Sequence, residues 1–344
     1  MKKLFAVFMV LVVVFSFSLN AFANEKTEGE VLTDQEFGFS VYEYTDPEHQ
    51  IVRTYVRNEN SVKVGNSRVL ESETYASTKQ LLLALGMEED NVMQMSNKRL
   101  EKYANAKNIT SVTTYTKNDA DGNIIVVSED EAMKEVARAG VGARSYPEIN
   151  NTETASSQDA YMRISLFTTY LGNGNYYFSA DAKWLNMPSY RSADSFGFAL
   201  NGHVVNIDSC FAWIEYDRIP YSILGNKYYH EAEGLLSSSY FYPVSGNWGG
   251  FAAAFDLKND WLMGDSYANY EVHIEMDTVI EYPSQALNFN VIATYHHSEK
   301  TVNISGVSIG LDSSGTVGMS IGIEMDNKYT RRYAYSGTPY SYTP

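Results

Sequence analysis

The sequence predicts an α+β protein, in which an N-terminal mixed α/β region precedes a larger antiparallel β-sheet or β-sandwich domain. Two observations lead to this fold class. Capping-box patterns at Ser77 and Ser128 predict helices in the first half of the chain. After residue 160 the chain is rich in Tyr, Phe and Trp, poor in helical periodicity and interrupted by turn residues, which is typical of antiparallel sheets.

Residues 1–23 have the features of a cleavable signal peptide. Lys2 and Lys3 precede an uncharged apolar run that ends at Phe17, and Ala21 and Ala23 form the small-x-small pattern of a cleavage site. The run is shorter than the roughly 20 residues that a membrane-spanning helix needs. We therefore expect a mature chain that begins at residue 24, is secreted and keeps no transmembrane anchor.

Residues 24–143 form the predicted mixed α/β region. It opens with two alternating segments, 37–44 and 51–56, which we expect to be strands. A capping box at Ser77 predicts the start of a Leu-rich helix, and Gly86 predicts its end.

The rest of this region predicts two more helices around a hairpin. A second helix is expected to start at Ser96. Segments 112–116 and 124–127 are expected to pair as a hairpin. Ser128 begins another capping box, for a helix that Gly140 would end.

The segment from Gly140 to Asp159 has the composition of a linker, because it contains Gly, Pro, Asn and Ser and few large apolar side chains, and we take residues 144–159 as the linker. We expect them to separate the mixed region from an antiparallel β domain at residues 160–344.

A first hairpin in that domain is predicted to join 270–280 to 287–297, with His273 opposite Thr294. This register places Glu271, His273 and His296 on one face and the apolar side chains on the other.

A second hairpin is predicted between 307–311 and 317–325. One of its faces is apolar, and the other consists of Gly and Ser. This alternation is similar to that of membrane-inserting strands, so a membrane-active β protein is one alternative function.

Parts of the chain resemble uncharacterised exported proteins of Gram-positive bacteria. The similarity involves the segment from Thr78 to Glu131, with Leu85-Gly86-Met87 and Asp121-Gly122-Asn123, and the segment from Tyr161 through Trp184 to Pro188. The resemblance implies export, and it implies no activity, cofactor or catalytic residue.

The charge of the chain argues against nucleic acid as a partner. Of the 26 basic side chains, two belong to the signal peptide, so the mature chain carries 24 against 42 acidic ones. Such a surface repels phosphate backbones. Cys210 is the only cysteine, which excludes an intramolecular disulfide, and its apolar surroundings favour a buried small hydrophobe over a nucleophile.

Two sets of residues are candidates for a site. Glu271, His273 and His296 offer imidazole and carboxylate ligands of the kind that zinc prefers. A solvated sheet face explains the same pattern, and we expect neither metal nor cofactor. Three tryptophans are candidate ligand-binding platforms; they are Trp184, Trp248 and Trp261.

The leading functional hypothesis is a non-enzymatic extracellular binding or interaction protein, whose partner is a cell-envelope or extracellular polysaccharide or a protein. An extracellular metal-dependent hydrolase is the other alternative.

Overall fold

A computed structural model describes 17 ranges of the chain. They are residues 30–34, 39–46, 50–57, 69–119, 124–142, 161–188, 191, 193–201, 209–220, 229–234, 241–243, 248–258, 265–279, 291–298, 304–311, 317–323 and 329–336. The predicted signal peptide and linker lie outside them. No helix within these ranges combines the length and apolar content that crossing a membrane requires.

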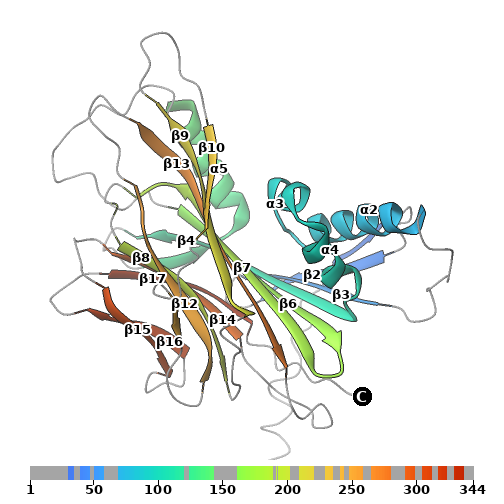
Figure 1. Cartoon of the computed structure of the whole chain (residues 1–344). Coiled ribbons are helices and arrows are strands. Elements are labelled where there is room, and N and C mark those ends of the chain that lie inside the picture. The colour runs from blue at the N-terminus through green and yellow to red at the C-terminus, as the bar shows by residue number, and fades with distance from the viewer. Residues whose placement is uncertain are drawn as a thin grey trace, which may run out of the picture.

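The main element of the fold is a ten-stranded sheet, in which every pair is antiparallel (Figure 1). Nine strands follow the order β1-β2-β3-β4-β6-β7-β13-β9-β10, and β5 pairs with β4. The strands are β1 (Glu30–Asp34), β2 (Phe39–Thr45), β3 (Ile51–Val56), β4 (Asn108–Asn118), β5 (Ile124–Val127), β6 (Tyr161–Gly172), β7 (Asn175–Asn186), β9 (Phe211–Ile219), β10 (Tyr229–Gly234) and β13 (Ser266–Val279).

A second, five-stranded sheet has the order β11-β12-β8-β14-β17. Its strands are β8 (Ala193–Asn201), β11 (Phe241–Pro243), β12 (Trp248–Asp256), β14 (Val291–Ser298) and β17 (Tyr329–Ser336). The two sheets face each other over an apolar core that includes Phe178 and Ile274 from the large sheet and Phe196, Phe251 and Tyr295 from the small one.

Helices cover the opposite face of the large sheet. They are α2 (Val69–Ala84), α3 (Glu89–Gln94) and α4 (Asn97–Ala104), which lie together in Figure 1, and α5 (Glu129–Gly142). Leu82, Leu85 and Leu100 from the helices pack on Ile109 and Tyr177 of the sheet and form a second core. The central strands of the large sheet are therefore buried on both faces.

The β-rich antiparallel architecture is confirmed, together with several elements of the N-terminal half. Ser96 is the N-cap of α4, Gly86 ends the first helix region with φ +87°, and β4 pairs with β5. The backbone N–H of Glu131 donates to Ser128 Oγ at the start of α5.

The predicted start of the first helix at Ser77 is wrong, because α2 begins at Val69. The residues from Val69 to Ser77 include no Gly or Pro that would end a helix, so the helix runs through the capping-box pattern. Helix α3 was not predicted.

The predicted hairpin of 270–280 with 287–297 is also wrong. Strand β13 pairs with β7 and β9, whereas β14 pairs with β8 and β17 in the other sheet. The apolar faces of β13 and β14 do share one core, but they meet across the sandwich. Alternation alone does not distinguish two strands that pair side by side from two that face each other.

The second predicted hairpin is confirmed as β15 (Ile304–Leu311) and β16 (Val317–Ile323). Val307 lies opposite Ile321, and Gly310 lies opposite Gly318, as the alternation predicts. Strand β15 contacts β11 and β12, and strand β16 contacts β8 and β14. The hairpin therefore lies against the small sheet.

The large sheet continues across the predicted linker. Strand β4 pairs with β6 over ten positions, from Asn108 opposite Tyr170 to Lys117 opposite Tyr161. The division at 144–159 stays a prediction from composition.

Limited proteolysis of the mature protein tests this organisation. The linker composition predicts a first cut between residues 140 and 159. Because β4 and β6 pair over their length, we expect the two fragments to co-elute in gel filtration and to separate only in denaturant. Fragments that separate under native conditions would contradict the observed pairing.

Candidate functional site

A group of charged side chains lies on the helix-facing side of the large sheet. We call it the buried charge cluster. It consists of Glu88 before α3, Arg163 on β6, Asp181 and Lys183 on β7, Glu215 on β9, and Glu271 and His273 on β13.

Strand register brings these side chains together. Glu271 lies opposite Lys183 on one neighbouring strand and opposite Glu215 on the other. His273 lies opposite Asp181 on the first of these strands. Residues that are about 90 positions apart in sequence therefore become direct neighbours.

Glu271 is held by three donors. Asn91 of α3 donates to its Oε1 at 2.8 Å, and Arg163 approaches the same oxygen at 3.4 Å. Lys183 Nζ lies 3.4 Å from Oε2. Arg163 and Lys183 also both pair with Glu88, so each cation bridges the helix side and the sheet.

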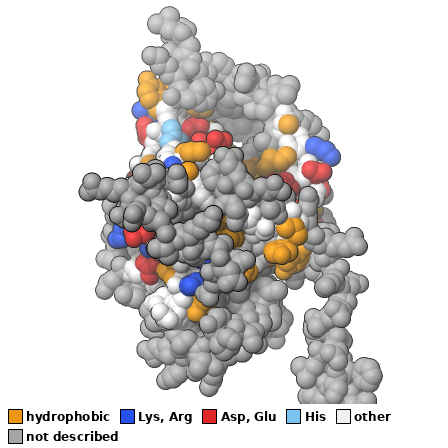
Figure 2. All heavy atoms as spheres, turned by 90° about the vertical axis from the view of Figure 1, so that its right-hand side faces the viewer, with side chains coloured by type: hydrophobic (Ala, Val, Ile, Leu, Met, Phe, Trp, Pro, Cys, Tyr) orange, Lys and Arg blue, Asp and Glu red, His pale blue; other side chains and the backbone are white. Residues whose placement is uncertain are grey.

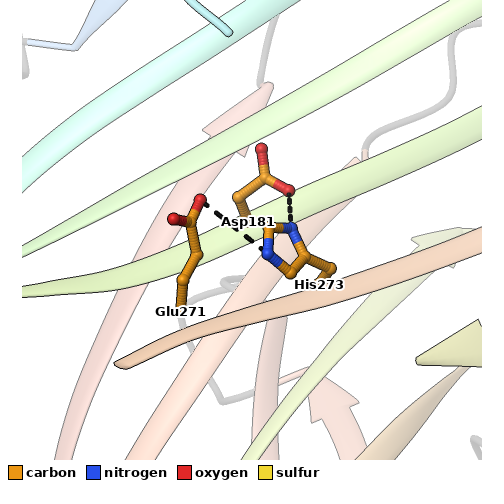
Figure 3. A group of neighbouring side chains, drawn as sticks. All are labelled: Asp181, Glu271 and His273. Atoms are coloured by element: carbon orange, nitrogen blue, oxygen red, sulfur yellow. Dashed lines mark hydrogen bonds and ion pairs between the residues drawn. The ribbon is translucent and has the colours of Figure 1, made fainter. Parts of the chain in front are cut away.

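His273 is 1% exposed and is held by Asp181 and Trp213. Its Nδ1 lies 2.7 Å from Asp181 Oδ1, and the indole of Trp213 stacks on the ring at 4.4 Å with a 12° interplanar angle. Its Nε2 lies 3.9 Å from Glu215 Oε1 and 4.0 Å from Glu271 Oε1. Figure 3 shows Asp181 at one nitrogen of the imidazole and Glu271 facing the other.

The electrostatics of His273 combine two opposing effects. Burial lowers the pKa of the imidazole, whereas the hydrogen bond to Asp181 and the charges of Glu271, Asp181 and Glu215 raise it. The net pKa is above the ordinary value.

Neighbouring pairs attach α4 to the same face. Arg99 pairs with Glu275 and lies 4.7 Å over the ring of Trp213. Tyr103 OH lies 2.7 Å from Ser179 Oγ. Burial raises the pKa of Glu275, and it also raises the pKa of Tyr103.

The structure brings together two of the three predicted metal ligands. Glu271 and His273 are neighbours, but His296 lies on β14 in the small sheet. The prediction that all three residues converge is therefore wrong. The reason is the same as for the hairpin, because β14 pairs with β8 and β17 and not with β13. Glu271 and His273 are also 5% and 1% exposed, so they do not form the solvated face that we expected.

Sequence reasoning missed Asp181 and Glu215. Asp181 lies between Ala180 and Ala182, which are both fully buried in the sandwich core. A single carboxylate inside a long apolar strand is a signal that it has a buried partner. Identifying that partner needs the strand order, which the sequence did not supply.

The candidate aromatic platforms are not equivalent. Trp184 is 1% exposed, and its Nε1 donates to Tyr295 OH at 3.0 Å inside the sandwich core. It presents no surface to a ligand. Trp248 is the first residue of β12, and Trp261 lies outside the described residues.

Cys210 is half-buried and packs against the sandwich core. This position agrees with the interpretation of Cys210 as a small hydrophobe.

Replacing Arg163 with Met tests whether the cluster supports the fold. Arg163→Met leaves the buried carboxylate of Glu271 and the partly buried carboxylate of Glu88 short of a cation, so we expect the free energy of unfolding to fall by about 3–5 kcal/mol. Lys117→Met is the control. Lys117 pairs with the exposed Glu131, and we expect a loss of about 0–1 kcal/mol. Equal losses in urea unfolding would show that the cluster contributes no more than a surface ion pair.

Comparisons with known proteins give no family. No protein-family model matches the chain, and no curated protein matches its sequence. A solved structure of the collagen-binding subdomain of the Enterococcus faecalis surface protein ACE is similar over 46% of this chain and 88% of its own, at 11% identity and a TM-score of 0.18. That similarity is too low to assign a fold or an activity.

Proposed function

We propose that this chain is a secreted, non-enzymatic protein that binds a partner outside the cell. Three features support the proposal. The first 23 residues have the pattern of a signal peptide, and the mature chain is acidic. The charged groups of the buried charge cluster point inwards beneath α3 and form ion pairs and hydrogen bonds with one another. An exposed apolar strip lies elsewhere on the sheet.

The exposed strip is the observation that carries the proposal. Val31, Tyr42 and Val56 lie on the three outermost strands β1, β2 and β3, and they are 49%, 54% and 58% exposed. Val31 lies directly opposite Tyr42, and Tyr42 lies opposite Thr54, two residues before Val56. Alternation therefore places all of them on one face, which is opposite to the face that Val41 buries against the helices. Apolar groups exposed together are typical of a binding surface.

The chemistry of the strip favours an uncharged polysaccharide as the partner. A Tyr ring beside aliphatic groups and the hydroxyl of Thr54 offers an apolar platform with a polar edge, which suits the two kinds of surface on a sugar ring. The acidic net charge of the chain disfavours polyanions. Figure 2 views the molecule from the side of the helices. Among the residues that the structure describes there, acidic, basic and apolar side chains are interspersed.

The alternatives have less support. A hydrolase that uses His273 needs its substrate to reach a side chain that is 1% exposed. A membrane-active protein needs the β15–β16 hairpin to leave the small sheet, against which both of its strands lie.

The Tyr42→Ser variant tests the proposal. We expect mature wild-type protein to bind a cell-wall fraction or a purified neutral polysaccharide. Tyr42→Ser should weaken that binding about tenfold or more, as loss of an aromatic anchor does. Tyr229→Ser is the matched control, because Tyr229 is 44% exposed on β10, at the other end of the sheet.

Three outcomes would contradict the proposal. They are binding of wild type to no fraction, equal binding by Tyr42→Ser and wild type, and leakage of dye from liposomes as the only measured effect of wild type.

A further inference from the structure

We infer that the buried charge cluster is a site for one divalent transition-metal ion of the zinc type, which His273 Nε2, Glu215 and Glu271 bind. The inference does not depend on the proposed binding function. It departs from the sequence-based expectation that no metal is bound, because the structure replaces the distant His296 with a partly buried carboxylate, Glu215.

The first argument is the orientation of His273. Its Nδ1 is held by Asp181 at 2.7 Å, so its Nε2 points towards two carboxylate oxygens. No hydrogen-bond partner lies at Nε2 among the described residues, although the nitrogen is buried. A carboxylate that accepts from one imidazole nitrogen while the other faces a metal is the usual arrangement at zinc-binding histidines.

The second argument is distance. Nε2 lies 3.9 Å from Glu215 Oε1 and 4.0 Å from Glu271 Oε1. These distances are too long for hydrogen bonds. A zinc ion with bonds of about 2.0–2.2 Å separates neighbouring ligand atoms by about 3.4 Å, so each carboxylate oxygen would come about half an ångström closer to Nε2.

The third argument is that each carboxylate already has a donor that holds it. Trp213 Nε1 donates to Glu215 Oε1 at 2.8 Å, and Asn91 Nδ2 donates to Glu271 Oε1 at 2.8 Å. Metal-binding carboxylates are commonly fixed in this way by outer hydrogen bonds.

The fourth argument is charge. Four carboxylates in the cluster face two permanent cations, Arg163 and Lys183; they are those of Glu88, Asp181, Glu215 and Glu271. These carboxylates outnumber the permanent cations by two, and a divalent ion supplies two positive charges. His230 is half-exposed and lies 3.4 Å from Glu215 Oε2.

The ligand types select the metal. Imidazole nitrogen together with carboxylate oxygen suits zinc better than calcium or magnesium, which prefer oxygen alone. The ion would join β13 to β9, and it would fix α3 to the sheet through Asn91. We assign it a structural role.

Metal analysis of the mature protein tests the inference. Protein purified without chelator is stripped and then titrated with Zn²⁺, and with Co²⁺ as a spectroscopic probe. We expect wild type to take up one equivalent of Zn²⁺, to melt at a higher temperature with it, and to give visible absorption bands with Co²⁺. His273→Gln should lose all three effects.

Two further variants keep the test independent of folding. Asp181→Asn changes only the outer partner of His273, and it should weaken Zn²⁺ binding about 10–100-fold. His297→Gln is the matched control. His297 is also buried, and its Nδ1 lies 3.0 Å from Asp194 Oδ1, but it lies in the small sheet. This variant should bind Zn²⁺ like wild type.

The inference is overturned if folded wild type takes up no Zn²⁺. It is also overturned if the His273→Gln and His297→Gln variants change Zn²⁺ uptake equally, because the ion would then be bound elsewhere.

Discussion

Burial of both faces of β6, β7 and β13 is the constraint on which the rest of this structure depends. One face packs on the small sheet and is apolar, as Phe178, Ala180 and Ala182 show. The other face lies under the helices and carries Asp181 and Lys183, which are close neighbours on the same strand. Polar groups that lose water must find partners in the protein. The buried charge cluster is the consequence.

The same constraint explains how the N-terminal half is attached. Strand β4 extends the sheet by pairing with β6, and α3 and α4 cover the strands beyond it. Each short helix brings its own polar contact to β13: Asn91 of α3 reaches Glu271, and Arg99 of α4 reaches Glu275. The helices therefore complete the polar face of β13, and these contacts join them to the sheet. A divalent ion at His273 would reinforce this attachment from within the sheet.

Local signals in the sequence predicted local structure well. The cap at Ser96, the glycine at Gly86 and the Gly/Ser alternation around Gly310 each depend on neighbouring residues, and the structure has α4, the helix end and the β15–β16 hairpin where they indicate. Partners that are distant in sequence were not predictable. The alternation of apolar and polar residues around His273 and around His296 was read correctly. Whether their strands pair side by side or face each other across the sandwich depends on the packing of both sheets. Asp181 and Glu215 could be identified as site residues only from the strand order, which places β7 and β9 on either side of β13.

The central claim is that one cooperative sheet, stabilised by the buried charge cluster, spans both halves of the chain. Amide hydrogen exchange of the mature protein, followed by mass spectrometry, tests it most directly. The account predicts that peptides from β4 and from β13 open with the same free energy, close to that of global unfolding. Exchange of β4 and the α2–α4 helices well before β13 would contradict it, because the N-terminal half would then unfold independently.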